Sequence, residues 1–122
     1  MFIIGGLISV FLSYFLNKFV VDLYGDKAVV YGVPIIEESS KTIMGYIFGS
    51  IIGAHFIFGV VESLNDFIVS PKEVNFRASV LSIITHLIFG AIAYYILIYV
   101  NIYTSIIITS IIHGYWNRFM LR

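Results

Sequence analysis

The chain has 122 residues, of which 60% are hydrophobic and only 11% are charged, and its mean hydropathy is +1.00. A soluble domain of this length cannot hide so much apolar surface from water, so the composition predicts an integral membrane protein. The formal net charge is zero and cysteine is absent, which argues against a nucleic-acid partner and excludes disulfides and thiolate chemistry.

The first predicted element is an apolar helix over residues 2–21. It lacks the basic start and the small-residue cleavage site of a secretion signal, so we expect it to stay in the membrane. The next apolar stretch, residues 28–69, would be about 63 Å long as one helix, twice the hydrocarbon thickness. It must therefore turn back, and the glycines within residues 49–53 favour a turn there. Helices are expected over 28–49, with a break at Pro34 as one option, and over 53–69.

Two more apolar helices are predicted over residues 77–99 and 102–120, with a short turn near Asn101 between them. We find no linker, low-complexity tract or internal repeat. The expected fold is therefore all-α: a polytopic transmembrane bundle of about five helices, forming a single integral membrane domain over residues 1–122.

Basic residues gather at alternate ends of the predicted helices, with Lys41 as the exception inside a helix. Five passes bring these ends to one face, which the positive-inside rule identifies as cytoplasmic. We therefore expect the N-terminus outside and the C-terminus in the cytoplasm. The basic residues at this face are Lys18, Lys27, Lys72, Arg77, Arg118 and Arg122.

Ionisable residues within the predicted helices indicate a functional site, because a charge at membrane depth is costly. On four helices such a residue lies nine or ten positions from a cytoplasmic basic residue: Lys27, Lys72, Arg77 or Arg122. That separation is roughly 13–15 Å of depth at 1.5 Å per residue. The matched depth predicts one polar cavity that opens towards the cytoplasmic half. We expect it to be lined by Glu37, Glu38, His86 and His113, with Glu62 and Asn117 nearby.

Some of these residues also have a purely structural interpretation. Glu37 and Lys41 stand at i and i+4, so they could form an ion pair that lowers the cost of burial, although this leaves Glu38 without a role. His55 is expected near the opposite membrane face, as a hydrogen-bonding core residue. Arg77 is expected to extend to the headgroups, or else to a substrate carbonyl.

Four short motifs occur in order on separate predicted helices: EESSK (37–41), AHFIFGVVESLND (54–66), RASVLSIITHLIFG (77–90) and HGYWN (113–117). Together they resemble the PrsW family of intramembrane proteases, which belongs with the CaaX-processing and bacteriocin-immunity (abortive-infection) proteases of the CPBP superfamily. The resemblance covers residues 34–118. It implies an intramembrane endopeptidase in a prokaryotic cell membrane, with a membrane-associated protein or peptide as substrate. Self-association into a homo-oligomer is left open.

The residue types at these motifs fit two schemes of peptide hydrolysis. In the first, one glutamate activates water as general base while the other orients the water or pairs with the lysine. Adjacent glutamates point about 100° apart on a helix, so both are not expected to face inward. A histidine and an asparagine one turn apart then hold the oxyanion. In the second, His86, His113 and Glu62 bind zinc and a glutamate is the base. The catalytic candidates are Glu37, Glu38, His86, His113 and Asn117, supported by Lys41, Glu62 and Arg77.

Two other classes of protein fit the same predicted helices. A small proton or ion transporter would also place Glu, His and Lys at mid-membrane, but it predicts paired repeats or broken helices in corresponding halves. A catalytically inactive immunity or scaffold protein would keep the helices and lose catalytic residues, whereas none of the four motifs is lost here. The sequence therefore favours the protease and keeps both alternatives in view.

Overall fold

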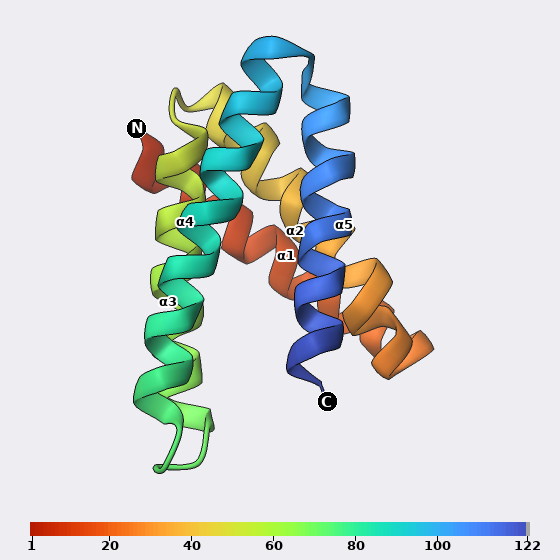
Figure 1. Cartoon of the computed structure of the whole chain (residues 1–122), viewed down its shortest axis with the longest axis vertical. Coiled ribbons are helices and arrows are strands. Elements are labelled where there is room, and N and C mark those ends of the chain that lie inside the picture. Colours follow the sequence, from red (N-terminus) through yellow and green to blue (C-terminus); the bar gives the residue numbers. More distant parts are fainter. Residues whose placement is uncertain (122) are drawn as a thin grey trace.

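The structure is a computed structural model that describes residues 1–121, and it is an all-α bundle (Figure 1). The prediction of a five-helix bundle is confirmed. Three helices, α1, α3 and α4, are long and apolar enough to cross a membrane. The described helices are α1 (Phe2–Tyr24), α2 (Asp26–Ile47), α3 (Ile51–Val69), α4 (Asn75–Tyr99) and α5 (Ile102–Met120).

The helix boundaries differ from the prediction mainly at α2. This helix begins at Asp26 instead of residue 28 and continues through Pro34 without a break. A proline inside a helix removes one backbone donor and crowds the carbonyl of the residue four positions earlier. In α2 that carbonyl belongs to Val30, and α5 packs closely against it at Gly114, as described below. Of the options left open for this segment, an unbroken helix is observed.

The turn between α2 and α3 lies at residues 48–50 and overlaps the start of the predicted stretch, residues 49–53. Gly49 takes φ +87°, a left-handed conformation that glycine adopts without steric penalty. Ser50 then caps α3, because its Oγ accepts a hydrogen bond of 3.0 Å from the Gly53 amide. Asn101 caps α5 in the same way, with Oδ1 accepting from the Thr104 amide at 2.8 Å. Ser50 and Asn101 therefore fix where α3 and α5 begin.

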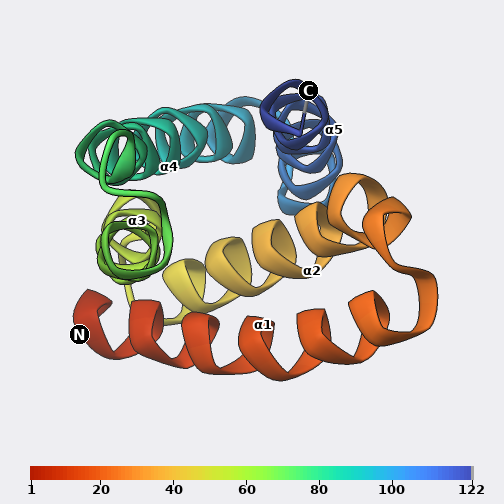
Figure 2. The same cartoon turned by 90° about the horizontal axis from the view of Figure 1, so that it is seen from below.

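The helices are not all parallel to one axis. In Figure 1, α3, α4 and α5 run along the long axis, while α1 and α2 form an inclined hairpin across them. Seen from below, α2 lies between α1 and the remaining helices (Figure 2). It packs against α1, α3 and α5. The helix that carries EESSK therefore occupies the centre of the bundle.

The interior of the bundle is polar and its surface is apolar. Among the buried residues, polar and charged side chains outnumber apolar ones, whereas large Phe, Leu, Ile and Tyr side chains are exposed on every helix. This distribution is the reverse of that in a soluble protein, in which charged residues are almost never fully buried. A bilayer can solvate such a surface, since lipid tails are as apolar as leucine.

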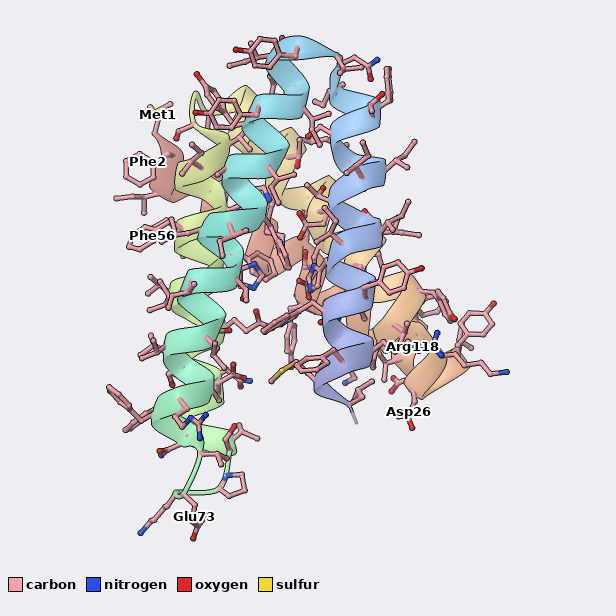
Figure 3. All side chains as sticks on the ribbon, in the orientation of Figure 1. Met1, Phe2, Asp26, Phe56, Glu73 and Arg118 are labelled. Atoms are coloured by element: carbon pink, nitrogen blue, oxygen red, sulfur yellow. The ribbon has the colours of Figure 1, made fainter. Side chains whose placement is uncertain are left out.

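The chain ends and turns divide into two groups along the long axis. Met1 and Phe2 lie towards one end, and Asp26, Glu73 and Arg118 lie towards the other (Figure 3). Arg118 belongs to the second group, and Lys27 and Lys72 directly adjoin its members Asp26 and Glu73 in the sequence. We call the end that carries the second group the basic end. Arg122, which was also predicted at the cytoplasmic face, lies outside the described residues.

This arrangement predicts which turns are accessible from the same side of a membrane. The chain contains no cysteine, so single substitutions such as Asp26→Cys, Glu73→Cys and Asn101→Cys can be labelled without interference. An impermeant thiol reagent should label the first two from the same side and the third from the opposite side. Labelling of Asp26→Cys and Glu73→Cys from opposite sides would contradict the expected topology.

Candidate functional site

Glu38 is the most heavily coordinated side chain in the bundle. Its Oε1 lies 2.7 Å from the Lys41 Nζ and 2.9 Å from the His113 Nδ1. Its Oε2 lies 3.1 Å from the His55 Nε2. Glu38, Lys41 and His55 are fully buried. One carboxylate thus joins α2, α3 and α5.

Lys41 places its ammonium at the centre of the same group. Besides Glu38, the Nζ lies 3.4 Å from the Glu37 Oε2 and 3.2 Å from the His86 Nδ1. It also stands 4.4 Å from the ring centroid of Phe58, where the aromatic face attracts a cation. The lysine therefore extends the network to α4.

Glu37 is buried as well and also contacts α1. Its Oε1 accepts a hydrogen bond of 2.9 Å from the Asn17 Nδ2 on α1. Its Oε2 has looser neighbours, with Lys41 at 3.4 Å and the His113 Nε2 at 3.9 Å. The expectation that only one glutamate faces inward is wrong, because α2 is central and has protein on more than one face. The cluster of Glu37, Glu38, Lys41 and their partners includes residues from all five helices.

His86 links this cluster to Glu62. A charged lysine can only donate hydrogen bonds, so the His86 Nδ1 accepts from Lys41 and the Nε2 must carry the hydrogen. The Nε2 contacts the Glu62 Oε2, which also receives the Ser82 hydroxyl at 3.4 Å. The Glu62 side chain is 38% exposed. His86 thus stands between a buried ammonium and an accessible carboxylate.

A cavity of about 170 Å³ lies beside Glu62, between α3, α4 and α5. Glu62, His86, His113 and Asn117 line it, and its wall extends to Asp66 near the basic end. The structure therefore confirms a shared cavity for the two histidines. Glu37 and Glu38 are not among the lining residues, however, because they lie on α2, and His113 contacts both glutamates from the cavity side.

Asn117 faces the cavity and also braces α5 against α2. Its Nδ2 donates to the Val29 carbonyl at 2.9 Å, and the Ser110 hydroxyl donates to the Pro34 carbonyl at 3.4 Å. Gly114, between them, lies so close that an added Cβ would be 2.6 Å from the Val30 carbonyl oxygen. One face of α5 thus contacts the backbone around Pro34.

Arg77 does not join the site. It is exposed near the start of α4 and is not a lining residue of the cavity. Its predicted contact with headgroups fits this position. Its supporting role at the catalytic cluster finds no contact in the described chain.

His55 was expected near the opposite membrane face as a hydrogen-bonding core residue. It lies in the first turns of α3 and is buried and hydrogen-bonded, but its contact with Glu38 was not predicted. Counting residues along helices assumes that each helix is nearly upright, but α2 is inclined (Figure 1). The inclination reduces the depth gained per residue, so Glu38 lies within reach of the first turns of α3. His55 therefore contacts Glu38 directly.

A sequence signal for His55 did exist, in the form of a short repeat. The segments HFIFG (55–59) and HLIFG (86–90) share four of five residues. On adjacent α3 and α4, an added Cβ on Gly59 would lie 2.8 Å from the His86 Cβ, and one on Gly90 would lie 2.8 Å from the His55 Cβ. Each histidine fits over the glycine of the other segment. The expectation of no internal repeat is therefore wrong at this point.

The contacts of His55 fix the number of protons in the cluster. Its Nδ1 lies 2.9 Å from the Ile51 carbonyl, which can only accept, so the Nδ1 carries a hydrogen. The Nε2 faces a Glu38 oxygen, and a hydrogen bond there requires one further proton on either atom. Two carboxylates, the Lys41 ammonium and this proton sum to zero charge. Neutrality is what a buried, weakly polar environment favours.

The three predicted zinc ligands, His86, His113 and Glu62, all line the cavity. Glu62 and the His86 Nε2 are in contact, but His113 directs its Nδ1 to Glu38. Within residues 1–121, no group of three or more His, Asp or Glu side chains is arranged to hold a metal ion. The Lys41 ammonium, 3.2 Å from the other nitrogen of His86, opposes the binding of a second cation there.

Comparison with known proteins gives no match: no family model, no curated protein and no solved structure matches this chain. The resemblance to the PrsW family therefore depends on the four motifs alone.

The contacts of His55 predict a strong effect on stability. His55→Ala should lower the free energy of unfolding by about 3–5 kcal/mol, because it leaves a buried Glu38 oxygen without a partner. Asn65→Ala, at an exposed position of the same helix, is the matched control and should change stability little. Equal unfolding midpoints for the two variants in detergent would contradict this account of the cluster.

Proposed function

We propose that this chain is an intramembrane endopeptidase of the PrsW type, which hydrolyses a membrane-associated protein or peptide. The observation that carries the proposal is the juxtaposition of a buried Glu–Glu–Lys cluster with a polar cavity, and His113 contacts both. Buried ionisable groups of this density are costly within a membrane and usually serve a function. The basic end is proposed to face the cytoplasm.

The two glutamates are suited to different roles. Glu38 has close partners on both oxygens, so it orients the His113 ring and stabilises Lys41. Glu37 keeps its Oε2 only loosely contacted, 3.9 Å from the His113 Nε2. A single water can bridge two atoms at that separation. We assign Glu37 as the general base and His113 as the group that helps to position the water.

The proposed reaction begins when the water attacks the substrate carbonyl carbon and its proton moves to Glu37. The oxyanion forms at the cavity wall, where Asn117 has a second amide hydrogen to offer. Glu37 then returns the proton to the leaving nitrogen as the C–N bond breaks. Glu62, bonded to His86, is placed to exchange the remaining protons with water in the cavity.

One observation favours an inactive scaffold or immunity protein as the second candidate. The cluster is neutral and its charged groups are paired with one another, which is also what a purely structural core requires. A transporter has less support, because α2 continues through Pro34 and the described helices are unbroken. Activity measurements distinguish the endopeptidase from the inactive scaffold or immunity protein.

The roles of the glutamates predict different outcomes for two matched substitutions. Glu37→Gln keeps the side-chain shape but removes the base, so it should lower turnover by about 10²–10⁴ and should cost less stability than Glu38→Gln. Glu38→Gln should lower stability as well, because three partners depend on its charge. Purified protein in nanodiscs would be incubated with a membrane-anchored peptide library, and the products identified by mass spectrometry.

Glu73→Gln, at an exposed position in the α3–α4 turn, is the control and should cleave at the wild-type rate. Cleavage at that rate by folded Glu37→Gln would eliminate Glu37 as the base. Absence of cleavage by the wild-type protein across the library would favour the inactive scaffold.

The arrangement of His86 and His113 predicts that hydrolysis does not depend on a bound metal. Treatment of the active protein with a chelator should leave the rate unchanged, because Lys41 already supplies positive charge beside the carboxylates. Loss of activity on chelation, restored by added zinc, would support the His86, His113 and Glu62 ligand set instead.

A further inference from the structure

A groove of about 430 Å³ runs between α2 and α5, separate from the catalytic cavity. Its walls are formed by Val30 and Ile35 of α2 and by Ile107 and Ile111 of α5. Three of these, Ile35, Ile107 and Ile111, are more than half exposed. No residue lines both the groove and the cavity beside Glu62. The groove is therefore an independent feature of the surface.

The floor of the groove is the close contact between the two helices. Gly114 has no side chain and approaches the Val30 carbonyl, so the two backbones are in contact there. The side chains on either side of this contact form the walls of the groove. Ser110 closes the floor next to Gly114, with its hydroxyl donated to the Pro34 carbonyl. The floor thus offers few unused polar groups.

The length of the groove matches one leaflet of a bilayer. From Ile107 to Arg118 the α5 helix rises about 16 Å, at 1.5 Å per residue. The hydrocarbon core of a bilayer is about 30 Å thick, so this is roughly half of it. Arg118 lies towards the basic end, beside the start of α2 (Figure 3). The groove therefore extends from a headgroup level to about the middle of the membrane.

The groove fits an acyl chain better than a peptide. An extended peptide would bring backbone N–H and C=O groups into a site with almost no partners, which is costly in lipid. A helix about 10 Å wide and 16 Å long would occupy more than about 1,200 Å³, well above the volume of the groove. An acyl chain has no polar groups and a narrow cross-section.

The charge of the groove selects an anionic headgroup. Among the described residues that line it, Arg118 is the only charged one and none is acidic. Within residues 1–121, Arg118 forms no ion pair with a carboxylate. Tyr31 and Tyr115 flank the same end, where their hydroxyl groups suit a membrane interface. Basic pockets between membrane helices on the cytoplasmic side bind anionic lipid headgroups.

We propose that this groove binds an anionic phospholipid of the leaflet at the basic end. One acyl chain lies along the groove between α2 and α5, and the headgroup charge lies at Arg118. This lipid would cover the seam at which α5 packs against α2.

The binding can be measured by fluorescence quenching with brominated lipids. Trp116 is the single tryptophan, so Trp116→Phe with Tyr115→Trp places one reporter at the rim of the groove. Tyr94→Trp in the same background, at an exposed site of α4, is the reporter control. Each protein would be reconstituted in phosphatidylcholine with increasing dibromo-phosphatidylglycerol or dibromo-phosphatidylcholine. If Tyr115→Trp fails to fold, Tyr31→Trp on the opposite wall takes its place.

The groove reporter should be half-quenched at an about fivefold lower fraction of the anionic lipid than of the zwitterionic lipid. The α4 reporter should respond equally to both. Arg118→Gln should abolish the preference, whereas Lys72→Gln, at an exposed position, should keep it. Equal quenching at the groove, or a preference that survives Arg118→Gln, would overturn the proposal. Protection of the reporter by an apolar transmembrane peptide at lower amounts than by anionic lipid would also overturn it.

Discussion

The rest of this bundle depends on the ion pairing of the buried Lys41 ammonium with Glu37 and Glu38. An isolated charge taken out of water costs several kcal/mol even after relaxation, so its burial requires compensating groups close by. Glu37 and Glu38 supply two negative charges for one positive charge, and the proton between Glu38 and His55 restores neutrality. Separation of α3 from α2 would leave part of this arrangement unpaired. The charge balance therefore holds the helices together in a surrounding where hydrophobic burial between helices is weak.

The position of α2 follows from the same requirement. It is not among the helices that are apolar enough to face lipid alone, and its hairpin with α1 and its contacts with α3 and α5 shield it. Pro34 leaves the Val30 carbonyl without its helical donor, and α5 approaches this point closely through Gly114. Asn117 bonds the Val29 carbonyl and Ser110 bonds the Pro34 carbonyl. These contacts fix α5 against α2 and align His113 with Glu38.

The number of helices and the level of the polar groups could be predicted from the sequence, because apolar run length and the cost of buried charge are local properties. The inclination of α2 could not, since it arises from packing between helices, and the contact between His55 and Glu38 depends on it. The same limit applies to Glu37 and Glu38, which were placed by an angular argument about one helix. Only the neighbours of α2 decide how many of its faces are buried. The similarity of HFIFG and HLIFG reflects the contact between α3 and α4. It could be interpreted only once the two helices were known to pack as neighbours.

A polar cluster in which every group has a close partner is stable but unreactive. The proposed chemistry therefore depends on an atom that lacks such a partner. Glu38 has close partners on both oxygens, whereas the Glu37 Oε2 has only long contacts on the side of His113. When Glu37 takes a proton from water in the proposed reaction, the total charge does not change. The negative charge moves from Glu37 to an oxyanion at the cavity wall, while Lys41 stays paired with Glu38. The reaction then requires negative charge to shift over a short distance beside a fixed positive charge, and preorganised sites lower the energy of such a shift.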